Sequence, residues 1–207
     1  MDVLAAVVGR TPWPGRPVLV AIDGVDGSGK TTFAAALSDA YAQAGRPALV
    51  VHEDDFLNPR VVRYQLGRDS PAGYFRDTYD LRVLTVHVLD AAAAARIVPA
   101  VFDHRADTPV DARPVEVAAD AVVLVEGMFL HRDELAGRWD LSVFLDVPFA
   151  ETVRRMAERD GSSPDPEHPS VRRYVDGQRI YLAACDPRER ATLVIDNTDP
   201  QAPRIAG

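Results

Sequence analysis

A glycine-rich segment at residues 24–31 constrains the fold of this chain more than any other feature. Its sequence, GVDGSGKT, matches the phosphate-binding pattern G-x-x-x-x-G-K-[ST] at every fixed position. Lys30 is the only lysine among the 23 lysine and arginine residues of the chain. Such a loop closes tightly around phosphate oxygens, and this favours a compact ammonium group over a planar guanidinium. The segment therefore predicts nucleotide binding.

Apolar runs of strand length alternate with helical segments along the chain. Strands are predicted at 17–23, 46–51, 121–125, 141–147 and 192–195, and helices at 30–44, 80–95, 148–159 and 170–184. This alternation predicts an α/β fold with a parallel sheet of about five strands and helices on both faces. The remaining predictions are a mild helix at 1–9, a small hairpin joining 97–102 to 115–117, and an irregular stretch at 57–79.

Composition narrows the class of protein. The 207 residues contain no repeat and no linker, so we expect a single domain, 1–207, with a lid at about 154–180. The net charge of −8 argues against a general nucleic-acid binder. Cys185 is the only cysteine, which excludes an internal disulfide, and no segment resembles a signal peptide or a membrane span. We expect a cytoplasmic protein without nucleic-acid or membrane partners, and a homo-oligomer is compatible with the sequence.

The carboxyl ends of the predicted strands carry the groups that phosphoryl transfer needs. The loop offers its backbone N–H groups, its lysine and a hydroxyl ligand for Mg²⁺. Its residues are Gly24, Val25, Asp26, Gly27, Ser28, Gly29, Lys30, Thr31 and Thr32. Glu126 ends the third strand, where it fits a second anchor for Mg²⁺ or only caps a turn. Asp54 and Asp55 end the second strand, and either fits a base for an attacking hydroxyl or a solvated loop acid.

A cluster of arginines predicts a lid. The cluster flanks a Pro/Gly/Ser-rich loop at 161–169 and comprises Arg154, Arg155, Arg159, Arg172, Arg173 and Arg179. Closure of this segment would bring positive charge to the transferred phosphoryl group. The alternative is a solvated helix whose arginines pair with Glu151, Glu158 and Asp160. His104 is a lone histidine that suits a polar substrate contact and an ordinary loop equally well.

A series of short motifs follows in a specific order between residues 18 and 197. They are GVDGSGKTT at 24–32, DDF at 54–56, SPAGYFRDTYD at 70–80, VFDHR at 101–105, LVEG at 124–127, RR…RD within 154–160 and ATLVIDN at 191–197. Together they resemble the uridine kinase branch of the P-loop kinases. The resemblance implies transfer of the γ-phosphate of ATP or GTP, with Mg²⁺, to the 5′-hydroxyl of uridine or cytidine.

The resemblance also implies roles for single residues. Asp54 matches the acid that activates the acceptor hydroxyl, and Glu126 matches the acid associated with magnesium. Asp80 matches a residue that holds the ribose hydroxyls, and His104 matches one near the pyrimidine edge. The expected catalytic residues are thus Asp54, Lys30, Arg155 and Arg159, the metal ligands Thr31, Glu126 and Asp54, and the acceptor contacts Asp80, Tyr74, His104 and Phe102.

Other classes of nucleotide-binding protein require sequence motifs of their own. A GTPase needs a second lysine in its guanine-recognition motif N-K-x-D, and a transporter ATPase needs an LSGGQ-like signature; both are missing from the sequence. A regulatory nucleotide-binding protein remains as the alternative of another class. Among kinases, the chain departs from the family at Leu57 and around His104, so the acceptor stays open. Nicotinamide riboside, pantothenate, a sugar and a nucleoside monophosphate are the alternatives.

Overall fold

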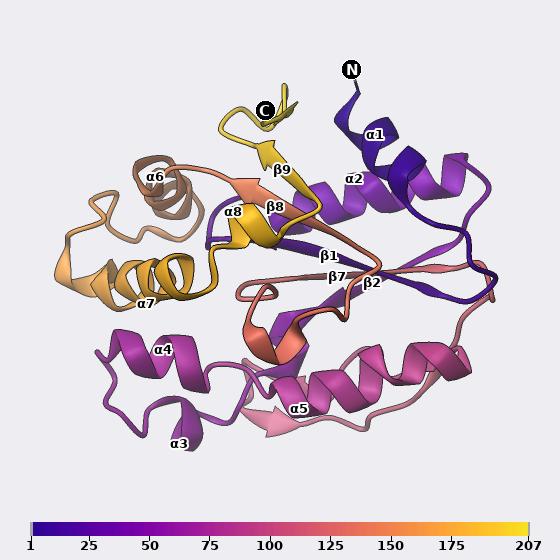
Figure 1. The fold of residues 1–207 in the computed structure, drawn as a ribbon. Coiled ribbons are helices and arrows are strands. Elements are labelled where there is room, and N and C mark those ends of the chain that lie inside the picture. The colour runs from indigo at the N-terminus through magenta and orange to yellow at the C-terminus, as the bar shows by residue number, and fades with distance from the viewer. Residues whose placement is uncertain (1, 207) are drawn as a thin grey trace.

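The computed structural model describes residues 2–206, and its centre is a sheet in the strand order β10-β9-β8-β1-β7-β2 (Figure 1). The strands are β1 (Val18–Gly24), β2 (Ala48–His52), β7 (Val122–Gly127), β8 (Leu141–Asp146), β9 (Leu193–Asp196) and β10 (Arg204–Ile205). All neighbours are parallel except β10, which runs antiparallel to β9. The predicted α/β fold with a parallel sheet is confirmed, and β10 is an edge strand that the sequence did not predict.

The middle strand, β1, delivers the phosphate loop from the centre of the sheet. Val20 lies opposite Leu124 of β7 on one side and Leu141 of β8 on the other. Every residue of β1 is buried. A continuous β-branched and aliphatic run is what a strand covered on both faces requires. The position of the loop is therefore fixed by a strand that is buried along its whole length.

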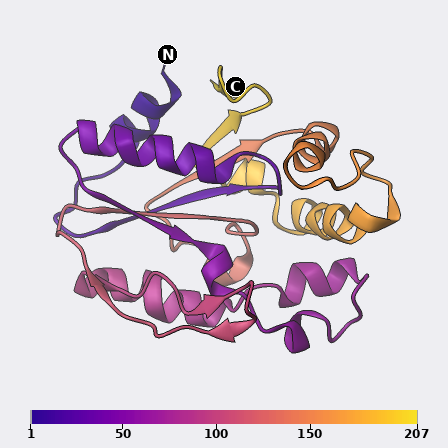
Figure 2. The same ribbon diagram turned by 180° about the vertical axis from the view of Figure 1, so that it is seen from behind.

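Helices cover both faces of the sheet (Figures 1 and 2). On one face, α1 (Val3–Arg10) and α2 (Lys30–Gln43) pack Val7, Phe33 and Leu37 against the strands. On the other face, α5 (Leu81–Leu84) continues through a π-helical turn, Thr85–Leu89, into a 3₁₀ turn, Ala91–Ala94. The helix predicted at 1–9 is confirmed for its described part, and Met1 lies outside the described residues. The predicted helix at 80–95 has the right extent but is not a regular α-helix.

The remaining helices gather at the end of the sheet where the parallel strands terminate (Figure 1). They are α3 (Arg60–Arg63), α4 (Pro71–Asp77), α6 (Phe149–Asp160), α7 (Pro169–Cys185) and α8 (Pro187–Arg190). The predicted helices at 148–159 and 170–184 are confirmed. The prediction that 57–79 is irregular is wrong, because Ser70 caps α4 by accepting from the Gly73 N–H at 3.1 Å and Pro71 suits its first turn.

Two small hairpins replace the single predicted one. β3 (Arg96–Ile97) pairs with β6 (Val115–Glu116), as expected from the sequence. The segment at 102 does not extend this pairing: β4 (Phe102–Asp103) pairs instead with β5 (Thr108–Pro109). Asp103 explains the break, because its carboxylate accepts from the N–H groups of Arg105 and Ala106 and closes a local turn. Among residues 2–206, no helix has both the length and the apolar character that crossing a membrane requires.

Candidate functional site

The phosphate loop approaches its neighbours so closely that glycine is required at two positions. Gly27 and Gly29 have φ angles of +77° and +93°, in the left-handed region that glycine favours. A Cβ atom on Gly27 would lie 2.6 Å from the Thr152 carbonyl oxygen of α6. A Cβ atom on Gly29 would lie 2.8 Å from Asn197 Nδ2. The loop is thus shaped by contacts with α6 and with the end of β9.

Side chains from distant segments hold the loop backbone in place. Gln178 of α7 accepts a hydrogen bond from the Asp26 N–H at 2.6 Å. Asn197, just after β9, donates to the Ser28 carbonyl at 2.7 Å. Lys30 begins α2, and its Nζ donates to the Val25 carbonyl at 3.0 Å. The ammonium group therefore lies folded over the loop, where phosphate oxygens would take the place of its carbonyl partner.

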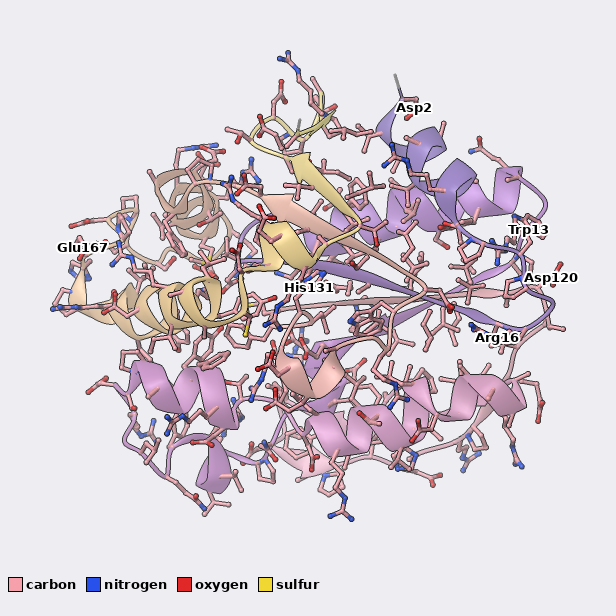
Figure 3. The ribbon with its side chains drawn as sticks, in the orientation of Figure 1. Asp2, Trp13, Arg16, Asp120, His131 and Glu167 are labelled. Atoms are coloured by element: carbon pink, nitrogen blue, oxygen red, sulfur yellow. The ribbon has the colours of Figure 1, made fainter. Side chains whose placement is uncertain are left out.

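A cavity of about 730 Å³ opens beside the loop, at the carboxyl ends of β1, β2 and β7. Trp13, Arg16 and Asp120 mark the opposite end of the molecule (Figure 3). Many predicted residues line the cavity, namely Asp26, Gly27, Gly29, Lys30, Thr31, Thr32, Asp54, Glu126, Arg155 and Arg159. The two acidic segments that follow β2 and β7 are therefore brought to the phosphate loop, as parallel strands with a common direction require.

Glu126 and Thr31 form a pair of oxygen ligands at the edge of this cavity. The Thr31 hydroxyl donates to Glu126 Oε1 at 2.9 Å, and His52 Nδ1 lies 2.6 Å from the same oxygen. A hydroxyl and a carboxylate suit Mg²⁺, which keeps several waters and takes further oxygens from substrate phosphates. The residues present therefore fit the ion that the family implies. The part of the chain that the structure describes contains no cluster of three or more His, Cys, Asp or Glu side chains able to hold a metal.

Asp54 and Asp55 lie on a 3₁₀ turn, Glu53–Phe56, that follows β2. The sequence places both residues at the end of the second strand, whereas β2 ends at His52 and the segment that carries them is helical. Asp54 lines the cavity, and its Oδ1 accepts a hydrogen bond from the Tyr79 hydroxyl at 3.0 Å. Asp55 is not among the residues that line the cavity. It is half-buried toward His52 and His104, and this burial raises the pKa of its carboxyl group.

Glu53 was not predicted, and it is fully buried between the strand ends. Neither of its carboxylate oxygens has a hydrogen-bond partner of good geometry within the described residues. A Cβ atom on Gly127 would lie 2.2 Å from Glu53 Oε2, so the glycine leaves room for this side chain. Burial, and then the charge of Asp23, raises the pKa of Glu53 well above its usual value. Burial therefore favours the neutral form of this carboxyl group.

The four predicted acceptor contacts lie away from the cavity lining. Tyr74 of α4 is buried, and its hydroxyl lies 3.5 Å from Met128 Sδ. Asp80 caps α5 by accepting from the Val83 N–H at 3.0 Å. Phe102 is buried in β4, and His104 is exposed in the turn that follows. Their roles in acceptor binding stay predictions.

The six arginines of the predicted lid lie in different environments. Arg155 donates to the carbonyls of Gly27, Asn197 and Thr198 at 2.9–3.3 Å and to Glu151 Oε1 at 2.8 Å. Arg159 lines the cavity and pairs with Asp160 at 2.9 Å. Arg155 therefore stabilises the backbone of the loop. The ion-pair partner of Arg159, Asp160, is an exposed side chain.

The other four arginines have structural partners. Arg154 pairs with Glu151 and Glu158, as the solvated-helix alternative predicts. Arg172 and Arg179 also pair with carboxylates, but their partners are Asp176 and Glu167, which the sequence did not predict. Arg173 is buried, and its guanidinium lies over the ring of Tyr64 at 4.7 Å from the centroid. A cation over an aromatic face stabilises the packing of α7 against the segment that joins α3 to α4.

A buried network directly behind the loop was also missed. Asp23, the residue before Gly24, accepts from the Gly24 N–H at 2.7 Å and from the Tyr181 hydroxyl of α7. His131, which lies at the centre of Figure 3, approaches the same carboxylate with Nδ1 at 2.6 Å. The only hint in the sequence is an acidic residue at the end of a strand that is otherwise apolar.

Comparison with known proteins places the chain among nucleotide-dependent kinases. No protein family model matches it. A curated uridine kinase from Leuconostoc citreum is 28% identical over 181 residues, which are 83% of this chain and 79% of that protein. The solved structure of a possible uridine kinase from Bacillus stearothermophilus has a TM-score of 0.69 at 28% identity, and the match covers 86% of this chain and 88% of that one. The resemblance to the uridine kinase-like P-loop kinases is confirmed.

A second solved structure widens the range of acceptors among the relatives of this kinase. It is described as a candidate fructose transport system kinase from Silicibacter sp. and has a TM-score of 0.70 at 27% identity. The match covers 88% of this chain and 95% of that one. The names of the relatives agree on phosphoryl transfer and differ in the molecule that receives the phosphate.

Proposed function

We propose that this kinase transfers the γ-phosphate of ATP or GTP to a hydroxyl group of a small molecule, with the 5′-hydroxyl of uridine or cytidine as the first candidate. One observation carries the proposal: a single cavity is lined by Lys30 of the phosphate loop, by Glu126 and by the carboxylate of Asp54. A phosphate-binding end and a base within one cavity are the parts that phosphoryl transfer to a hydroxyl requires.

Each residue of the cavity has a role in this proposal. The loop N–H groups and Lys30 hold the phosphates, and Asp54 accepts the proton of the acceptor hydroxyl as its oxygen attacks the γ-phosphorus. The bond from that phosphorus to the bridging oxygen breaks, giving the phosphorylated acceptor and a nucleoside diphosphate. Thr31 and Glu126, with Asp54 as a further candidate ligand, would hold Mg²⁺, which neutralises phosphate charge when bound. Arg159 adds positive charge as the lid closes.

The acceptor is proposed from the relatives rather than from the cavity. The curated relative is named a uridine kinase, which supports a pyrimidine nucleoside. A sugar is the second candidate, because one structural relative is described as a fructose transport system kinase and because Asp80 and His104 do not line the cavity. Within this proposal the chain is one domain with a lid at about 154–180, works in the cytoplasm and serves nucleoside salvage, either alone or as a homo-oligomer.

The test is formation of ADP from ATP in the presence of each acceptor in turn. The panel contains uridine, cytidine, fructose, nicotinamide riboside, pantothenate and uridine monophosphate, and GTP is then compared with ATP. We expect uridine or cytidine to give the largest kcat/KM and a product that carries the phosphate at the 5′ position by mass spectrometry and ³¹P NMR. A higher kcat/KM for fructose would replace the nucleoside by a sugar. Binding of ATP without turnover on any acceptor would favour the regulatory alternative.

A further inference from the structure

Among the residues that the structure describes, the Tyr79 hydroxyl is the one side-chain group that donates a hydrogen bond to Asp54. Its oxygen lies 3.0 Å from Asp54 Oδ1, and both residues line the cavity. Within residues 2–206, this is the only hydrogen bond of the phenol. A carboxylate has two oxygens, so a donor that holds Oδ1 leaves Oδ2 available to an incoming hydroxyl.

Packing of the ring and pairing of the backbone both fix the position of Tyr79. Its ring is 5% exposed and packs edge-on against Phe129, with the ring centroids 6.2 Å apart. Its backbone bridges to Leu57, and the next N–H, that of Asp80, donates to the Phe56 carbonyl at 2.9 Å. Phe56 is the last residue of the turn that carries Asp54, and Leu57 directly follows it, so the donor and the carboxylate belong to one packed unit.

The hydrogen bond gives the phenol the role of donor. A carboxylate oxygen only accepts, so the Tyr79 hydroxyl donates its proton to Asp54 Oδ1. A phenylalanine at this position would fill the same space and leave the carboxylate free to rotate.

We propose that Tyr79 is a positioning residue, whose hydroxyl fixes the carboxylate of Asp54 so that its second oxygen faces the acceptor hydroxyl. The inference rests on the proposed function, because it assumes that Asp54 is the base. It gives Tyr79 no direct contact with the phosphates or with the acceptor. Its effect is on the geometry of attack, so the turnover rate should change and substrate binding should not.

The first experiment compares Tyr79→Phe with the parent in steady-state kinetics, with uridine as the first acceptor or the panel member that gives the highest kcat/KM. We expect kcat to fall about 10-fold, the scale of one hydrogen bond to a charged group, with both KM values within about twofold of the parent. Tyr41→Phe is the matched control, because it removes another buried phenol hydroxyl. Tyr41 lies on α2, away from the cavity, and its hydroxyl oxygen lies 2.5 Å from the Thr11 hydroxyl oxygen. Its kcat should equal that of the parent.

Two further measurements separate this inference from its assumptions. In the Asp54→Asn background, adding Tyr79→Phe should cause no further loss of kcat, because the two residues act through one group. Crystal structures of the parent and Tyr79→Phe with a non-hydrolysable ATP analogue need no acceptor, and we expect the Asp54 carboxylate to rotate or lose its order in the variant.

Each outcome has a definite meaning. An unchanged kcat in Tyr79→Phe, or an Asp54 carboxylate that keeps its orientation in the variant crystal, would overturn the positioning role. A raised acceptor KM with kcat preserved would also overturn it, since Tyr79 would then bind the acceptor. If the parent phosphorylates no acceptor, the proposed function fails, while the crystal comparison still decides whether Tyr79 orients Asp54.

Discussion

The two ends of the cavity are built in different ways. The end that we propose binds phosphate, called the phosphate end, is formed by consecutive residues between the last residue of β1, Gly24, and the first of α2, Lys30. At the end that we propose receives the acceptor, called the acceptor end, Asp54, Tyr79 and Met128 come from separate segments that meet only in the folded chain. Local sequence thus specifies the first end, and long-range packing specifies the second. Substitutions at the two ends should therefore reduce activity by different amounts and change different kinetic constants.

The largest effect is expected at Lys30, at the phosphate end. Lys30→Ala should reduce ATP turnover by about 10³-fold or more, because it removes the charge that reaches the terminal phosphates. Lys30→Arg should also be severely impaired, since a planar guanidinium does not fit where the ammonium folds over the loop. The measurement is kcat/KM for ATP, with circular dichroism to show that the fold is intact. Near-normal turnover in either folded variant would contradict the assignment of the phosphate end.

Asp54 should give the next largest effect, and it tests the acceptor end. Asp54→Asn should lower kcat by about 10²-fold or more and leave ATP binding largely intact, as expected for the loss of a general base. Asp55→Asn is the matched control, because the neighbouring carboxylate does not line the cavity. Its kcat should stay within about threefold of the parent. A larger loss of kcat in Asp55→Asn than in Asp54→Asn would exchange the two roles.

The sequence predicts the phosphate end almost completely and the acceptor end only in outline. The loop motif, the buried strand before it and the helix after it are local patterns, and each is present where predicted. The contact between Asp54 and Tyr79 joins residues 25 positions apart through a 3₁₀ turn and an isolated β-bridge. Neither feature has a periodic signal in the sequence. Resemblance to a family selected Asp54 over Asp55, and the 3₁₀ turn that carries both residues was not predicted.

In the predicted lid, too, the sequence predicts the local elements but not the contacts between them. The helices that became α6 and α7 were predicted from their patterns, but the partners of their arginines were not. Arg155 and Arg159 are one turn apart on α6, yet only Arg155 reaches the loop carbonyls, because Gly27 brings the loop against Thr152. Such a close approach depends on how the loop and α6 pack in the folded chain. The spacing of the arginines along the sequence does not predict it. The same holds for Glu53, whose burial follows from a glycine in β7.

Replacing Arg159 and replacing Arg155 should therefore change different kinetic constants. Arg159→Ala should lower kcat by about 10-fold with little change in ATP binding, because positive charge at the transferred group counts most in the transition state. Arg155→Ala should instead raise the KM for ATP, since it releases the carbonyls of Gly27 and Asn197. Hydrogen exchange at 161–169 should decrease when an ATP analogue and an acceptor bind. Equal exchange in both states, with kcat unchanged in both variants, would show an ordinary surface loop.

Glu53 should give the smallest effect, and it appears in stability rather than in turnover. A carboxyl group whose pKa is raised by folding stabilises the native state fully below its unfolded pKa of about 4.3 and loses that contribution as the pH rises toward its folded pKa. Glu53→Gln mimics the neutral form at every pH. The variant should match the parent at pH 4 and have the larger free energy of unfolding at pH 8.

Denaturant unfolding with EDTA at both pH values measures this difference between Glu53→Gln and the parent. Glu116→Gln is the control, because the Glu116 side chain is 79% exposed and its neutralisation should change stability little at either pH. A variant that is less stable than the parent at pH 8 would mean that the Glu53 carboxylate is charged and stabilised in the native state. The acidic strand ends would then hold a second buried charge beside Asp23, and this part of the cavity would depend on electrostatics rather than on packing around a neutral group.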